Sequence, residues 1–311
     1  MKTSTAWRAL IAVLLLATAS SAFAGWYSTG GTWNYRKTIA IDYTKVPNTD
    51  QTNFPVLVSL TDTGLTNALS TGFDILFTSS DGTTMIPYER EAFTKSTGAL
   101  VAWVKVPTVS HTANTVIYMY YGNSGASDQQ QATNVWASNY NGVWHLKESG
   151  NGTAGEYKDS TANANNGTGG ATGSATKPTV NTSGKIQNAE TFGTGGITNY
   201  INAGNPASLQ IGSATAGTIS AWVYPQVVTS GKQYRVFGKS IASNQEYAFG
   251  WDYNNIAVTI KGASYTTTTS PIVINNWYYL TFVFSGGNTI AIYTNGTLLT
   301  SQSITTASTG S

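Results

Sequence analysis

Short runs of β-branched and aromatic residues, separated by clusters of Gly, Asn, Asp and Thr, recur along almost the whole chain. Runs of this length and spacing predict antiparallel strands packed into a sandwich or a barrel, and they leave little room for helices. Only residues 66–70 and 129–138 suggest short helical turns. The expected strands cover residues 33–41, 54–60, 73–77, 100–106, 115–121, 218–224, 234–239, 247–253, 256–260, 277–284 and 289–294.

Two dipeptides predict tight hairpins between expected strands. Asn295-Gly296 lies between residues 290–293 and 298–299, and Asp81-Gly82 lies between residues 74–77 and 85–88. Both central residues of a two-residue hairpin turn need positive φ, which Gly, Asn and Asp tolerate best. We therefore expect antiparallel pairing across each dipeptide.

The composition divides the chain into two halves. A polar stretch at 122–131 and a long Gly-, Asn- and Thr-rich segment at 150–184 flank the middle of the chain, whose 311 residues exceed what one core usually holds. We expect β domains at residues 25–138 and 139–311, with the boundary near Asn139. Few apolar residues occur in the long segment, so it should form loops on the second domain.

The first 24 residues have the pattern of an export signal. Lys2 and Arg8 precede an apolar run at 9–17, and Ala22-Phe23-Ala24 has the small-x-small form of a cleavage site. The run is too short to span a bilayer, and no later segment is apolar enough to do so. We expect a signal peptide at 1–24 and an exported protein that is periplasmic, extracellular or attached to the cell surface.

The residue counts exclude several kinds of chemistry. The chain has no Cys and only two His, which rules out thiolate catalysis, disulfides and multi-histidine metal sites. It has 16 basic and 14 acidic residues, and two of the basic residues lie in the expected signal peptide. The remaining chain therefore carries no excess positive charge with which to bind nucleic acid.

The first half resembles the bacterial secreted family called domain of unknown function 2341. The resemblance rests on these pieces, in order: Trp33-Asn-Tyr-Arg-Lys37, Asn53-Phe-Pro-Val-Leu-Val58, Phe77-Thr-Ser-Ser-Asp-Gly82, Pro87-Tyr-Glu89, Ala102-Trp-Val-Lys-Val-Pro107 and Ile117-Tyr-Met-Tyr-Tyr-Gly122. The family has no established activity, so this resemblance implies a β domain and no reaction.

From Gly142 onward the chain resembles the laminin-G-like, concanavalin-A-like jelly rolls. The resemblance rests on these pieces: Val143-Trp-His-Leu146, Asp159-Ser-Thr-Ala-Asn163, Asn166-Gly-Thr168, Phe192-Gly193, Ile219-Ser-Ala-Trp-Val223, Asn276-Trp277 and Ile292-Tyr-Thr-Asn-Gly296. We therefore predict an all-β protein of two β-sandwich domains, of which the second is a jelly roll.

The family's last strand, an apolar and acidic run, has no counterpart in residues 298–311, which are rich in Thr and Ser. The jelly roll should then lack its last strand, as in a truncated chain. The domain's first strand, at 142–146, would lose its usual neighbour. We expect it to keep an open edge, to be covered by the first domain, or to pair with another segment.

Paired carboxylates are the chief candidates for catalysis. Glu89 and Glu91 are two residues apart on an expected strand, so they point to one face, and glycoside hydrolysis uses two carboxylates. We favour a solvated sheet edge instead, with Arg90 and Lys95 nearby. The glycosidase strand Glu-x-Asp-x-x-Glu of some concanavalin-A-like relatives is missing from the sequence. His145 is better explained as a hydrogen-bonded structural histidine, so we expect no enzyme.

Calcium is a possible cofactor that the resemblance implies. Laminin-G-like domains often hold Ca²⁺ with carboxylate and backbone oxygens, and Asp159 stands where the family's Asp-Ser-x-Gly-Asn loop begins. The alternative is that Asp159 caps a turn through its own backbone. The acids that commonly follow Phe-Gly in the family are missing after Gly193, which favours the alternative.

Sugar recognition without catalysis uses exposed aromatic faces and uncharged polar groups. Trp251 and Tyr253 precede the expected turn at Asn254, and the three residues form our candidate carbohydrate site. Trp222 and Trp277 lie inside apolar runs, where packing is the usual role of Trp, so we expect Trp222 to be buried between the sheets.

These observations favour an exported, non-catalytic glycan-binding or surface-adhesion protein, whose partner is an extracellular glycan or a cell-surface protein. A structural extracellular module that contacts proteins and has no sugar site is the alternative. A calcium-dependent glycosidase comes third. An exposed aromatic cleft would favour glycan binding, whereas a broad apolar patch would favour a protein partner.

Overall fold

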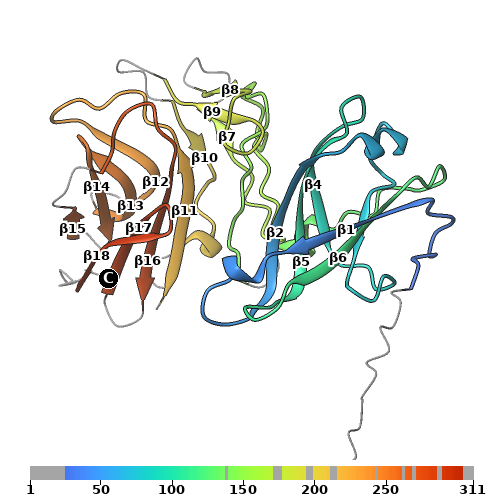
Figure 1. The fold of residues 1–311 in the computed structure, drawn as a ribbon. Helices are drawn as coiled ribbons and strands as arrows, with labels where there is room; N and C mark the ends of the chain where they lie inside the picture. Colours follow the sequence, from blue (N-terminus) through green and yellow to red (C-terminus); the bar gives the residue numbers. More distant parts are fainter. Residues whose placement is uncertain are drawn as a thin grey trace, which may run out of the picture.

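The computed structural model consists almost entirely of antiparallel strands (Figure 1). It describes residues 25–303 except 137–138, 171–176, 194–198, 211–215, 242–243, 261–262, 268–270 and 286–288. The expected signal peptide at 1–24 and residues 304–311 lie outside the described residues. Within the described residues, no helix is long and apolar enough to cross a membrane. The all-β prediction is confirmed.

The first half is a sandwich of two three-stranded sheets. Met119 from one sheet and Tyr88 and Val104 from the other are fully buried in a shared apolar core. One sheet has the order β1-β6-β3, with β1 at Tyr35–Ile41, β6 at Thr115–Tyr121 and β3 at Leu76–Thr78. The other has the order β2-β5-β4, with β2 at Gln51–Thr61, β5 at Ala99–Val109 and β4 at Tyr88–Thr94.

The second half packs two four-stranded sheets around a separate apolar core. Phe249 and Phe282 face each other across this core with ring centroids 6.1 Å apart. In the sheet β11-β16-β17-β18 the strands are Gly217–Val223, Tyr278–Ser285, Thr289–Thr294 and Thr297–Ser303. In the sheet β12-β13-β14-β15 they are Gln233–Ile241, Asn244–Asp252, Asn255–Ile260 and Ala263–Thr266.

The segment between the sandwiches is mostly loop, as its composition predicts, and Figure 1 shows it between them. Among the described residues of this segment, the regular structure consists of two short strand pairs and one 3-10 turn. The strands are β7 (Thr168–Gly169) with β10 (Ile201–Asn202), and β8 (Thr179–Asn181) with β9 (Ala189–Thr191); the turn is η3 (Ala207–Leu209). In the first half, the short helical pieces are η1 (Tyr43–Lys45), η2 (Thr63–Asn67) and α1 (Ala132–Val135).

One predicted hairpin turn is confirmed and the other differs. Asn295 and Gly296 have φ values of 49° and 81°, as a two-residue turn between β17 and β18 requires. At the other site only Gly82 has positive φ. The carboxylate of Asp81 accepts the backbone N–H groups of Thr83 and Thr84, which fixes a wider loop in place of the tight turn.

The expected first strand of the second half is not a regular strand. Within residues 142–146 the structure records a single bridge, between Trp144 and Asp159. The side chains of His145 and Lys147 instead contact Glu89 and Glu91 of β4. Two of the three expected outcomes therefore occur together: the first half contacts this segment, and Trp144 pairs with Asp159 of another segment.

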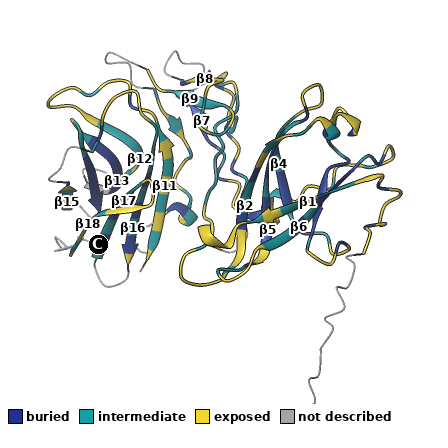
Figure 2. Cartoon of the chain, in the orientation of Figure 1, coloured by how far each residue is buried: buried dark blue, intermediate teal, exposed yellow. Residues whose placement is uncertain are grey.

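The prediction that Trp222 is buried between the sheets is wrong. On β11 the side chains alternate, so that Ile219 and Val223 pack against the core, while Trp222 lies on the outer face with 39% of its surface exposed. Figure 2 shows buried residues along β14 and β16 and more exposed residues along β11. Each sheet has only one face against the core, so an apolar run does not bury every side chain.

Candidate functional site

An aromatic groove lies on the outer face of the sheet β11-β16-β17-β18. Trp222 and Tyr279 are direct partners across β11 and β16, with ring centroids 5.2 Å apart. The groove has a volume of about 530 Å³. Its lining residues are Lys185, Trp222, Trp277, Tyr279, Asn295 and Gly296. The groove therefore combines two Trp and one Tyr side chain with an amide and one cation.

Neighbouring turns fix the position of the groove's side chains. The backbone N–H of Asn295 donates to Tyr279 O at 2.8 Å, and Asn295 Oδ1 accepts from Tyr279 N at 2.9 Å. These two bonds hold the β17–β18 turn against the start of β16. The Tyr279 hydroxyl donates to Ser220 Oγ at 2.9 Å, and Trp277 packs against Tyr224 with ring centroids 5.2 Å apart. The aromatic faces are thus held in place before any ligand binds.

The predicted platform of Trp251, Tyr253 and Asn254 is not assembled as expected. Trp251 is buried, with 8% of its surface exposed, and stacks on Tyr234 at 5.5 Å between ring centroids. Burial removes its face from solvent, so the expectation that Trp251 stacks on a sugar is wrong. Tyr253 is 46% exposed, while Asn254 is half-buried and its backbone oxygen accepts from Ile272 N. Only Tyr253 presents an aromatic ring there.

The sequence pattern indicates that one face of β11 is exposed. We overlooked this pattern because residues 219–223 are mostly apolar. Thr218, Ser220 and Trp222 alternate with apolar residues on β11, Tyr224 follows directly after the strand, and all four are exposed. Strict alternation over a strand predicts that one face is solvated. Reading Trp222 with its polar neighbours at i−2 and i−4 would have placed it on the outer face.

Asp159 organises a loop, and its surroundings do not suit a calcium ion. Its Oδ1 accepts the backbone N–H groups of Val143 and Thr161, each at 2.9 Å. Its Oδ2 accepts from Thr161 Oγ1 and Asn165 N, also at 2.9 Å. The lone pairs of both carboxylate oxygens therefore already accept hydrogen bonds, whereas a Ca²⁺ ion would have to be coordinated by those same lone pairs. Among the described residues no cluster of three acidic or histidine side chains can hold a metal ion.

Glu89 and Glu91 share one face, as predicted, but that face is not a solvated edge. Both residues are buried, and Glu89 has only 6% of its surface exposed. Glu89 Oε2 accepts from Trp136 Nε1 at 2.6 Å, and its Oε1 accepts from Ser160 Oγ at 2.7 Å. The covering groups come from residues 136–160, which the sequence does not place next to β4. The expectation of a solvated edge is therefore wrong.

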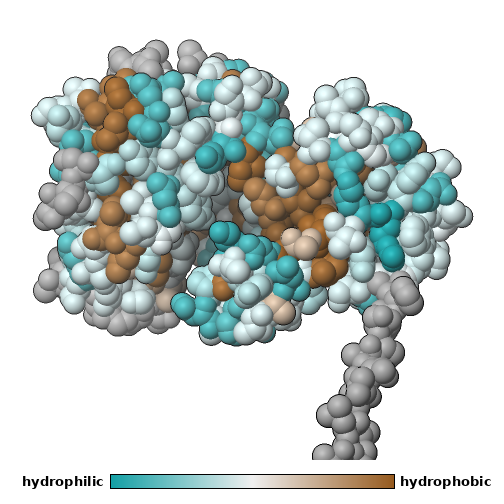
Figure 3. Space-filling view, viewed as in Figure 1, coloured by the Kyte–Doolittle hydropathy of each residue, from teal (hydrophilic) through white to brown (hydrophobic). Residues whose placement is uncertain are grey.

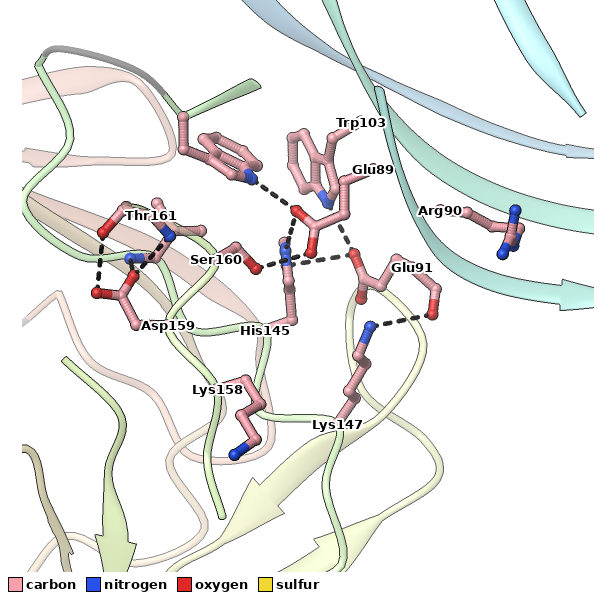
Figure 4. A network of polar contacts seen from close by, with 12 residues as sticks. Glu89, Arg90, Glu91, Trp103, His145, Lys147, Lys158, Asp159, Ser160 and Thr161 are labelled. Carbon is pink, nitrogen blue, oxygen red and sulfur yellow. Dashed lines mark hydrogen bonds and ion pairs between the residues drawn. The ribbon is translucent and has the colours of Figure 1, made fainter. Parts of the chain in front are cut away.

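His145 lies between the two carboxylates (Figure 4). Its Nε2 is 3.0 Å from Glu89 Oε2 and its Nδ1 is 3.4 Å from Glu91 Oε2. Glu91 Oε2 also accepts from Trp103 Nε1 at 2.7 Å, and the imidazole stacks on the Trp103 ring. His145 is thus hydrogen-bonded, as predicted, although Glu89, 56 residues away, could not be named as its partner from the sequence.

The electrostatics of this cluster differ from those of a glycosidase acid. Burial would raise the pKa of Glu89, but hydrogen bonds from His145, Trp136 and Ser160, together with the charge of His145, hold it below its usual range. A general acid for glycoside hydrolysis needs a raised pKa so that it keeps its proton. The described contacts instead favour an ionised Glu89 that connects the two halves.

A cavity of about 480 Å³ opens beside Glu89, and three cations line it. Each of these cations already has a partner. Arg90 Nη2 is 3.2 Å from Asp128 Oδ2, Lys147 Nζ donates to Glu91 O at 3.3 Å, and Lys158 Nζ donates to Gly155 O at 2.7 Å. Arg90 is thus paired with a carboxylate, whereas Lys147 and Lys158 are held by backbone carbonyl oxygens.

Comparisons with known proteins agree with this architecture. Residues 71–147 match the family described as Domain of unknown function (DUF2341), and residues 193–311 match the Concanavalin A-like lectin/glucanases superfamily. A DUF2341 segment is thus followed by a concanavalin A-like segment. The latter match covers the sheets around Phe249 and Phe282 and the groove residues from Trp222 to Gly296.

Among solved structures, the crystal structure of the binding domain of Paraclostridial Mosquitocidal Protein 1 is similar at 16% identity and a TM-score of 0.39. The alignment covers 51% of this chain and 40% of that chain. This chain therefore spans less than half the length of the protein it matches. No curated protein matches the chain.

Proposed function

We propose that this chain is an exported, non-catalytic glycan-binding or surface-adhesion protein that binds sugar in the groove of Trp222 and Tyr279. The observation that carries the proposal is the exposed pair of aromatic rings in a groove with an amide at Asn295. Ligand sites combine apolar and aromatic faces with a few placed polar groups. The concanavalin A-like match over this sheet supports the same class of ligand.

The groove suits a sugar ring because a ring has one face rich in C–H groups and a rim of hydroxyls. The C–H face packs against an aromatic face, whose electron density attracts it. The hydroxyls reach donors and acceptors at the rim, such as the Asn295 side chain. A single sugar has about 12 non-hydrogen atoms, and about −0.3 kcal/mol per atom gives a Kd near 1 mM. Useful adhesion then requires several sugars or several copies of the protein.

We propose binding without catalysis because the paired carboxylates of the first half are hydrogen-bonded to other side chains of the protein. Glu89 and Glu91 accept hydrogen bonds from two indole N–H groups and lie against His145. Changing both residues to Gln should leave glycan binding intact. If the protein hydrolyses a polysaccharide and the double variant loses that activity, the non-catalytic proposal is wrong.

A glycan array of the protein without residues 1–24, run with Ca²⁺ and with a chelator, tests the function. We expect binding in both conditions, because the Asp159 surroundings do not suit the ion. Trp222→Ala should abolish the signal by removing one of the two neighbouring rings of the groove. Tyr253→Ala is the matched control, since it removes an aromatic ring outside the groove that is at least as exposed, at 46% against 39% for Trp222. Equal binding by Trp222→Ala and the unchanged protein would contradict the proposed site.

A second candidate function, contact with a protein partner, has its own observation. Apolar side chains gather over β2 and the neighbouring β1 in Figure 3, and Phe54 on β2 is 46% exposed. Apolar patches on a surface often mark protein contacts. Cell adhesion that fails in Phe54→Asp while glycan binding is unchanged would favour this function. Adhesion that fails in Trp222→Ala would favour the glycan.

A further inference from the structure

The aromatic groove has an unbalanced charge. Lys185 is the one charged residue among the six that line it, and neither Asp nor Glu contributes. Its Nζ lies 5.1 Å from the centroid of the Trp222 ring, at a distance where a cation is attracted to an aromatic face. The recorded ion pairs of the described residues do not include Lys185. The ammonium is therefore positioned at the ring without a carboxylate to neutralise it.

The uncharged groups of the groove add to an excess of hydrogen-bond donors. Asn295 Oδ1 accepts from Tyr279 N, so the amide offers a ligand chiefly its NH₂ group. Trp222 and Trp277 each carry an indole N–H, which can donate and cannot accept. The Tyr279 hydroxyl gives its proton to Ser220. A ligand rich in acceptors is favoured here over one that mainly donates.

From this arrangement we propose that the groove selects sugars that carry an anionic substituent, a carboxylate or a sulfate, on the ring. The sugar ring packs against the aromatic side chains of the groove, while its anionic group pairs with the Lys185 ammonium, which lies over the Trp222 ring. This inference rests on the proposed glycan-binding function and names the class of glycan. Neutral sugars would use the same aromatic faces but would leave the ammonium without a partner.

The test compares oligogalacturonate with the same oligosaccharide as its methyl ester, which differs in charge and keeps the sugar rings. Binding to the full chain is measured by calorimetry at low and high salt. We expect the acid to bind about fivefold more tightly, the range of a partly exposed ion pair, and this ratio should fall as salt screens the pair. A sulfated oligosaccharide of similar length forms a further arm that distinguishes the two anionic groups.

Three variants separate the contributions of charge and ring. Lys185→Gln should bind acid and ester equally, while Trp222→Ala should bind neither. Lys232→Gln removes an exposed lysine outside the groove lining and should keep the preference for the acid. Tight binding of the sulfated ligand with weak binding of the carboxylated one would support the anionic class and narrow it to sulfate.

The failures of the two proposals are distinguishable. If the unchanged protein binds the ester as well as the acid, or if Lys185→Gln keeps the preference, the anionic proposal is overturned and glycan binding stands. If neither charged nor neutral oligosaccharides bind in this test or on the array, the proposed function itself is overturned.

Discussion

Two acidic residues of the middle segment show how local surroundings decide the cost of a charge. Asp159 accepts four hydrogen bonds and is held in a loop by them. Glu190 on β9 is half-buried, and neither of its carboxylate oxygens has a recorded hydrogen-bond partner. Burial, followed by the nearby charges of Glu148 and Glu156, raises the pKa of Glu190 to about 7. The fold therefore stabilises the ionised carboxylate of Asp159, whereas ionisation of Glu190 destabilises the folded state.

The Glu190 carboxyl predicts a pH-dependent stability. Its pKa in the folded protein lies above the value near 4.3 of an unfolded chain, so the folded state binds the proton more tightly. Stability is therefore lost as the pH rises from about 4.3 to 7. Glu190→Gln should melt at a higher temperature than the unchanged protein at pH 8, and this advantage should shrink at pH 4.5. An advantage of the same size at both values would contradict the account of this residue.

The strands of the second half each present one face to the core and one to the solvent. On β16, Phe282 faces Phe249 in the core, while Tyr279 lies on the outer face beside Trp222 of β11. Packing and the candidate site therefore use alternate residues of the same elements. A change on the outer face should alter binding with little effect on folding, and the reverse should hold for the inner face.

This separation predicts different unfolding costs for two aromatic residues of one sheet. Phe282→Ala should lower the free energy of unfolding by about 3 to 5 kcal/mol, because it leaves a cavity in the core. Trp222→Ala should cost about 1 kcal/mol or less, because the residue is partly exposed and does not belong to the apolar core. Urea unfolding measures both. Similar costs for the two variants would show that Trp222 contributes to the core.

The sequence predicts the strands well, since alternation and turn residues act over a few positions. The Asn295-Gly296 turn and most strands, such as β6 at Thr115–Tyr121, lie where expected. Contacts between distant segments could not be predicted in this way. Nothing local to Glu89 identifies His145 as its partner, and nothing local to Trp251 shows that Tyr234 covers it.

At the scale of the whole molecule, a buried polar cluster joins the two halves. Glu89 and Glu91 belong to the first sandwich, and His145 comes from the segment that leads into the second. Trp103 and Trp136 surround the imidazole, with ring centroids 6.0 and 5.9 Å from it. Buried charges are tolerated only when paired, so the cluster specifies how this segment packs on the first half.

Loss of His145 should therefore loosen the connection between the halves. His145→Ala leaves the two buried carboxylates without the imidazole that lies between them, which should speed protease cleavage between the two sandwiches. The matched control is His111→Ala, which breaks an exposed pair with Asp50 and should change little. Equal cleavage rates for both variants and the unchanged protein would show that the cluster does not hold the segment.

Acid should also weaken this cluster in the unchanged protein. The pKa of Glu89 is lowered in the folded state, so its stabilising contribution is complete above the unfolded value near 4.3. That contribution is lost as the pH falls through the lower, folded value. The protection of the β4 amides, measured as the exchange rate relative to the intrinsic rate at the same pH, should fall below about pH 4, and less so in Glu89→Gln. Protection that stays the same as the pH falls would contradict this role for Glu89.

The central claim, that sugar binds on the outer face at Trp222, is tested most directly by the indole N–H resonances in an NMR titration with a glycan. The sequence has nine Trp residues, and replacing each by Phe assigns its signal. We expect the Trp222 and Trp277 signals to shift with ligand concentration, while the signals of buried Trp251 and of Trp103 beside Glu91 stay in place. Shifts at Trp103 and Trp136 with none at Trp222 would contradict this claim and place the ligand at the carboxylate cluster instead.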